Sequence, residues 1–125
     1  MPTDFVSWMF LIGRVLMGGA FVVAGIRNLR SLPRLTGLME GRKFPMPAQA
    51  TLLGVLVQTI CGALVAIGIF TPWAALGLAA FLAAATLIVH PYWAFSKGDQ
   101  GVHINACIVN SALVGAFILL ASVTF

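Results

Sequence analysis

Four apolar runs, each close to the length of a membrane-crossing helix, divide this sequence. They cover about residues 5–26, 48–70, 72–90 and 104–125. A helix needs about 20 mostly apolar residues to cross the hydrocarbon core of a bilayer. Only 8% of the 125 residues are charged, whereas a soluble domain carries about 25%. The sequence therefore predicts an all-α integral membrane protein, with residues 1–125 forming a single antiparallel four-helix bundle.

The basic residues predict how this bundle is oriented. Two loops on the same side of the membrane hold six of the seven Lys and Arg residues: Arg27, Arg30, Arg34, Arg42, Lys43 and Lys97. The N-terminus, the Phe70–Thr71 turn and the C-terminus carry none. By the positive-inside rule, the loop 27–47 is cytoplasmic and both termini are periplasmic in a bacterial inner membrane. The positive charge is thus explained by topology and does not predict nucleic-acid binding.

Arg14 is the one ionisable residue within the first apolar run. It also argues that this run is a retained span and not a signal peptide, because it interrupts the run and no basic residue precedes it. A charged group at membrane depth costs about 2.5–3.5 kcal/mol on insertion scales. The three acids, Asp4, Glu40 and Asp99, all fall in terminal or loop stretches. Arg14 therefore needs polar partners from other spans, a bound anion or a second protein.

Helical spacing predicts polar faces that point into the bundle. In the first span the face carries Arg14, Gly18, Phe21 and Gly25. Counting from the cytoplasmic ends at 1.5 Å per residue puts Arg14 and Gln58 at similar depth, about 15–18 Å in. The predicted ligand site is a cavity open toward the cytoplasmic leaflet, lined by Arg14, Gln58, Thr86, His90 and Asn110.

Small residues at four-residue spacing indicate where helices approach closely in lipid. The stripes are Ala20 with Ala24, Gly54 and Gly62 with Gln58 between them, Ala79 with Ala83, and Ala112 with Ala116.

Each polar residue also has a purely structural interpretation. Arg14 would be a hydrogen-bond hub for Gln58 and backbone carbonyls, and the other polar residues would join helices to one another. Pairing of Arg14 with a partner subunit is a third alternative.

Metal and thiol chemistry are weakly supported. His90, His103 and Asp99 have the residue types of a two-histidine, one-carboxylate metal site, but their spacing carries no metal signature. Cys61 and Cys107 differ in predicted depth by about 15 Å, too far for a disulfide. No metal site, catalytic residue or intrinsic cofactor is predicted.

Four short motifs resemble the DoxX family of small four-span membrane proteins. The first span is similar to the family pattern Arg-x3-Gly-x2-Phe-x2-Ala-Gly-x2-Lys/Asn-Leu, here Arg14, Gly18, Phe21, Ala24, Gly25, Asn28 and Leu29. The second resembles Glu-x3-Gly-x5-Gly-x2-Thr, with Gln58, Gly62, Gly68 and Thr71. Thr-x3-His and Asn-x4-Gly correspond to Thr86 with His90 and to Asn110 with Gly115.

The chain departs from this pattern at Gln58, where the family often has Glu. An acid there is expected to pair with Arg14, whereas the amide of Gln58 would donate or accept a hydrogen bond without neutralising the charge. An anion or an acidic partner near Arg14 becomes the more plausible neutralising group.

The resemblance implies a membrane component of an oxidoreductase system, with a quinone as the expected ligand. Two alternatives stay open: a protein that binds a lipid or small molecule without a redox role, and a structural protein that forms homo-oligomers. Membrane lipid is a partner under every alternative.

Overall fold

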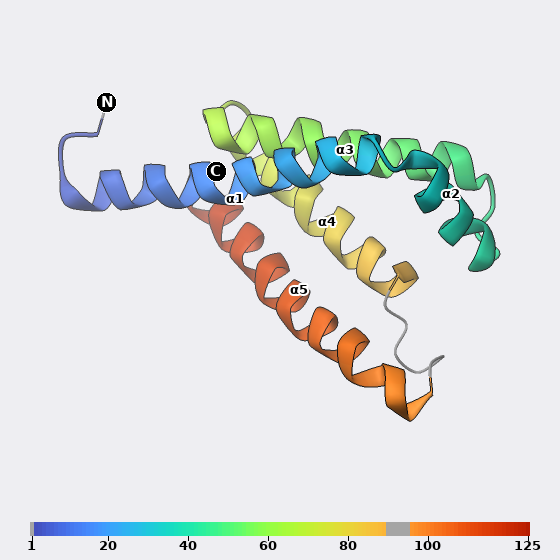
Figure 1. The fold of residues 1–125 in the computed structure, drawn as a ribbon. Helices are drawn as coiled ribbons and strands as arrows, with labels where there is room; N and C mark the ends of the chain where they lie inside the picture. The colour runs from blue at the N-terminus through green and yellow to red at the C-terminus, as the bar shows by residue number, and fades with distance from the viewer. Residues whose placement is uncertain (1, 90–95) are drawn as a thin grey trace.

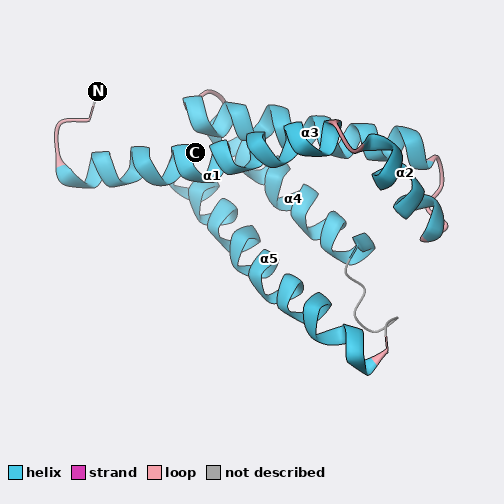
Figure 2. Cartoon of the chain, in the orientation of Figure 1, coloured by secondary structure: helices cyan, strands magenta, loops and turns pink. Residues whose placement is uncertain are grey.

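A computed structural model describes residues 2–89 and 96–125, and these fold into five helices with no strand among them. Figure 2 shows this all-helical architecture. The helices are α1 (Phe5–Leu29), α2 (Leu32–Gly41), α3 (Pro47–Ile67), α4 (Thr71–Val89) and α5 (Lys97–Thr124). Four of them, α1, α3, α4 and α5, are long and apolar enough to cross a membrane. The predicted all-α membrane bundle is confirmed.

The helices form two pairs. α1 packs mainly on α3, α4 packs mainly on α5, and the α3–α4 contact joins the pairs. In Figure 1 the blue α1 lies beside the green α3, while α4 and α5 leave this layer together at an angle. The short helix α2 folds back and packs against α3. At the far end from α2, the first turns of α1 extend beyond the end of α3 (Figure 1).

Helix ends differ from the predicted spans where a local residue overrides hydropathy. α1 ends at Leu29 and α2 begins at Leu32, because Pro33 lacks an amide hydrogen and is tolerated only in the first turn of a helix. α3 stops at Ile67, since Gly68 adopts a left-handed φ of 85°. α5 begins at Lys97, seven residues before the predicted span. The first turns of α5 are polar, so they fall outside the apolar run that predicted this span.

The apolar core lies where the two pairs meet. Val65, Leu78 and Phe117 are the largest fully buried side chains, contributed by α3, α4 and α5. Phe21 of α1 meets Phe117 edge to face, with ring centroids 5.2 Å apart. Such aromatic pairs add about 0.5–1.5 kcal/mol beyond their buried area. This pair connects the α1–α3 layer to α5.

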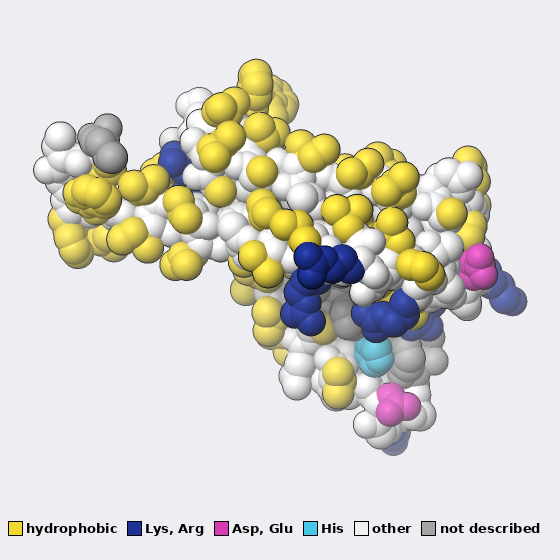
Figure 3. Space-filling view, turned by 45° about the horizontal axis from the view of Figure 1, so that its top comes forward, with side chains coloured by type: hydrophobic (Ala, Val, Ile, Leu, Met, Phe, Trp, Pro, Cys, Tyr) yellow, Lys and Arg dark blue, Asp and Glu magenta, His cyan; other side chains and the backbone are white. Residues whose placement is uncertain are grey.

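The surface of the bundle suits a lipid environment. Large exposed hydrophobic side chains are found on all four long helices, and yellow side chains are spread widely over the face shown in Figure 3. Most of the Lys and Arg side chains in that view gather from its lower centre to its right, and one lies apart at the left. At the basic end, an Arg42 Nη donates to the carbonyl oxygen of Val89 at 3.4 Å. This contact puts a cation near the C-terminus of α4, where the helix dipole favours it.

Candidate functional site

Arg14 reaches the end of α3. A Cβ built on Gly68 would lie 2.7 Å from one Nη and 2.9 Å from Cζ of Arg14, so the guanidinium lies directly against the Gly68 backbone. Gly68 is the C-cap of α3. The C-terminus of a helix carries about half a negative charge. The structure thus places the intramembrane cation beside the negative end of a neighbouring helix.

The immediate surroundings of the guanidinium offer little hydrogen bonding. Its Cζ lies 5.9 Å from the centroid of the Phe10 ring, within the range of a cation–π contact. Nε is buried and has no hydrogen-bond partner in the described part of the chain. An arginine has five N–H donors, and a buried donor left unsatisfied costs about 1–3 kcal/mol. The site therefore has donor capacity for water or for a ligand.

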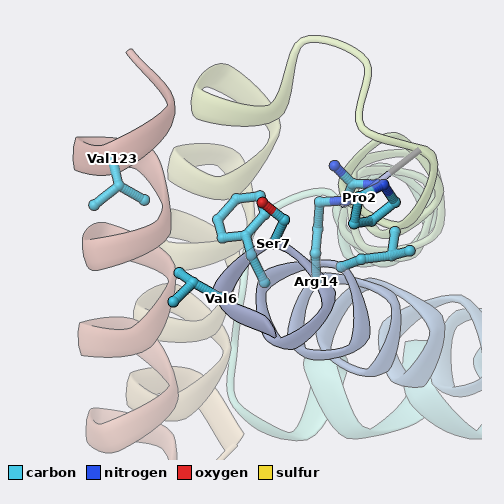
Figure 4. A pocket seen from close by; sticks show the side chains of 7 residues that line it. Pro2, Val6, Ser7, Arg14 and Val123 are labelled. Carbon is cyan, nitrogen blue, oxygen red and sulfur yellow. The ribbon is translucent and has the colours of Figure 1, made fainter. Parts of the chain in front are cut away.

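A pocket of about 670 Å³ opens beside Arg14 (Figure 4). It runs along the first three turns of α1 and reaches the end of α5, and it is lined by Pro2, Val6, Ser7, Phe10, Leu11, Arg14 and Val123. Of these, Ser7 and Arg14 alone carry polar side chains. The pocket combines one cation with apolar walls, and its volume falls within the usual range of about 300–1,000 Å³ for ligand sites.

The first turn of α1 is stabilised by an N-terminal cap. The Ser7 backbone N–H donates to an Asp4 carboxylate oxygen at 2.8 Å. The Ser7 side chain and this backbone bond lower the pKa of Asp4 below its ordinary value. Asp4 is therefore ionised at neutral pH, but it lies ten residues before Arg14, about 15 Å along the helix.

The expected partnership of Arg14 with Gln58 is wrong. The Oε1 of Gln58 accepts a hydrogen bond from Asn28 Nδ2 at 2.9 Å. Gln58 is ten residues before Gly68, about 15 Å along α3, and Gly68 is where Arg14 lies. Gln58 is buried, and its carbonyl oxygen accepts from a side chain that the site prediction did not include.

Thr86 and Asn110 form a separate polar pair. Asn110 Nδ2 donates to Thr86 Oγ1 at 2.9 Å and so joins α4 to α5. His90 lies outside the described residues, so its part in a site or in the alternative metal set stays a prediction. The described residues hold no group of three metal-ligating side chains, and neither Cys61 nor Cys107 is in a disulfide bond.

The predicted site residues thus fall in distinct places. Arg14 lines a pocket at the end of the bundle that holds both termini, instead of a cavity open toward the basic end. Gln58 pairs with Asn28, and Thr86 pairs with Asn110. Whether any of them binds a ligand stays a prediction.

Sequence reasoning missed two residues that define the geometry, Asn28 and Gly68. Both residues occupy positions of the family motifs given above, and this membership could have marked them as candidates.

The structure is that of a small multi-pass membrane protein. It has four long apolar helices in close contact and a cation at the end of one of them. Residues 9–91 match the DoxX family, a match that includes Arg14, Asn28, Gln58 and Gly68. The chain belongs to the DoxX family.

The chain is also similar to a curated protein that is named as an inner membrane protein. The chain is 25% identical over 113 residues to the inner membrane protein YphA of Escherichia coli (strain K12), covering 90% of this chain and 81% of the relative. No solved structure matches the chain.

Proposed function

We propose that this protein binds the headgroup of a membrane-soluble molecule in the Arg14 pocket. One observation carries the proposal: Arg14 lines an apolar pocket, and its buried Nε has no hydrogen-bond partner among the described residues. Charged groups in membrane spans are functional-site hypotheses by default. The walls formed by Val6, Phe10, Leu11 and Val123 suit an apolar tail.

The ligand needs acceptor oxygens on an apolar body. A quinone supplies two carbonyl oxygens, and an anionic lipid supplies phosphate oxygens together with a neutralising charge. Both match a guanidinium, which donates and cannot accept. A quinone is our leading ligand because the family resemblance implies an oxidoreductase system, in which this chain would be a membrane component or anchor. We assign no catalytic residue to the chain.

A ligand test follows from this chemistry. We expect decyl-ubiquinone or dioctanoyl-phosphatidylglycerol to raise the melting temperature of the detergent-solubilised protein. A ligand at 100 times its Kd stabilises by about 2.7 kcal/mol, which is several degrees for a small domain. Arg14→Ala should abolish the shift. Arg34→Ala, a matched exposed arginine on α2, should leave it intact.

The pattern of response identifies the ligand class. A shift with the quinone alone supports the oxidoreductase assignment, and a shift with the lipid alone supports lipid binding without a redox role. Failure of both probes at saturation would contradict the proposal. An anchor or homo-oligomeric role would then be tested by co-purification and by mass measurement.

We also propose a bacterial inner-membrane location with both termini periplasmic and the loop 27–47 cytoplasmic. The six basic residues of the two loops support it. In this orientation the Arg14 pocket lies in the periplasmic half of the membrane.

Reporter fusions test the orientation. A fusion after Phe125 should give a periplasmic signal, and an insertion at Gly41 a cytoplasmic one. Neutralising Arg27, Arg30 and Arg34 together should produce a mixed population, because the charge difference between the two sides is reduced. A cytoplasmic C-terminus in the unmodified chain would refute the orientation.

A further inference from the structure

Gly68 closes α3 in a conformation that other residues rarely adopt. Its φ is 85° and its ψ is 27°, in the left-handed region that favours glycine. Its N–H and that of Ile69 both donate to the carbonyl oxygen of Leu64, at 2.9 and 3.0 Å. This arrangement is a common way to end a helix. Conformation alone would therefore account for a glycine at position 68.

A second feature of Gly68 is independent of its φ. The space that a Cβ would occupy is filled by the guanidinium of Arg14, with Nη atoms 2.7 and 3.2 Å away and Cζ at 2.9 Å. A Cβ contact below 3.0 Å requires something to move. The guanidinium is the flexible partner, since the other side of the contact is the backbone of the turn. A side chain at position 68 would therefore force the guanidinium of Arg14 to shift.

We propose that Gly68 is a positioning residue for the Arg14 site. Because Gly68 has no Cβ, the guanidinium can lie directly against its backbone. This position is beside the negative end of α3 and at the edge of the pocket. Phe10 restrains the guanidinium from within α1 through the cation–π contact. The α3–α4 turn therefore determines where the donors of Arg14 meet the headgroup. This inference rests on the proposed function for its ligand, but not for the contact between the two residues.

The contact is tested without ligand by a double-mutant cycle. Melting temperatures are compared for the unmodified chain, Gly68→Ala, Arg14→Ala and the double variant in detergent. Removing the guanidinium removes the clash, so Gly68→Ala should lower the melting temperature clearly less in the Arg14→Ala background than in the unmodified chain. Coupling of this kind is expected for residues in contact. Arg34→Ala is the control: its change in melting temperature and that of Gly68→Ala should add in the double variant.

The positioning role is tested with decyl-ubiquinone and dioctanoyl-phosphatidylglycerol, whichever raises the melting temperature of the unmodified chain. We expect Gly68→Ala to weaken its binding by about tenfold or more, the size of one lost charged hydrogen bond. Gly68→Asn should weaken it similarly, because asparagine tolerates the left-handed conformation but still carries a Cβ. This second variant remains informative if the alanine variant does not fold.

The outcomes separate this inference from the proposed function. Additive melting temperatures for Gly68→Ala and Arg14→Ala would overturn the positioning role. So would unchanged probe affinity in Gly68→Asn. A coupled cycle with no response to either probe would support the contact and overturn the proposed function instead.

Discussion

Gly18→Leu is expected to destabilise the bundle by about 3 kcal/mol or to prevent its assembly, at the upper end of overpacking costs. A Cβ on Gly18 would collide with the carbonyl oxygen of Gly62 and lie 2.5 Å from the backbone nitrogen of Ala66. These are backbone atoms of α3 and cannot rotate away as a side chain would. Small residues allow membrane helices to approach this closely. Thermal unfolding in detergent measures the effect.

The adjacent residue provides the control for this substitution. A Cβ on Gly19 would meet nothing within 4 Å, so Gly19→Leu should stay near the stability of the unmodified protein. Both variants remove a glycine from the same turn of α1 and gain the same side chain. Equal losses for the two would show that helix propensity or insertion, and not the α1–α3 contact, sets the stability.

Periodicity predicted one face of α1 correctly. The spacing of Arg14, Gly18, Phe21 and Gly25 puts them on one side of a helix, and Gly18 and Gly25 are indeed buried against α3. The small-residue pairs were less reliable. Ala79 is buried, but Ala20, Ala83 and Ala112 are exposed. Spacing shows which residues share a face, whereas hydrophobicity all around a membrane helix leaves open which face meets protein.

The register between α1 and α3 was not predictable from counting residues. A count of residues gives the membrane depth of Arg14 and Gln58 only if α1 and α3 end at the same level on the cytoplasmic side. In the structure, α2 folds back against α3, and Asn28, one residue from the end of α1, pairs with Gln58 in the middle of α3. The first turns of α3 thus extend past the end of α1. This offset carries Arg14 away from Gln58 to the far end of α3, and it follows from tertiary packing that a count of residues does not contain.

The Asn28–Gln58 pair has a consequence for charge at position 58. Gln58→Glu is expected to destabilise the bundle by about 3 kcal/mol, the cost of a buried charge without a partner. Gln58 is 5% exposed, and it faces the neutral amide of Asn28. Arg14 is too far along the helices to compensate. The sequence alone led to the opposite expectation, since an acid at 58 appeared to be the natural partner of Arg14.

Adding Asn28→Lys to Gln58→Glu should restore most of the lost stability, because the two positions are in hydrogen-bond contact and the pair would become an ion pair. The family pattern permits Lys at the position of Asn28 and Glu at that of Gln58, so the double variant exchanges a neutral pair for a charged one. Asn28→Lys alone should destabilise, since it puts an unpaired cation at a half-buried position. The stability changes of Arg14→Ala and Gln58→Glu should be additive, as expected for distant sites. Coupling of Gln58→Glu to Arg14→Ala, with no rescue by Asn28→Lys, would contradict the observed register of α1 on α3.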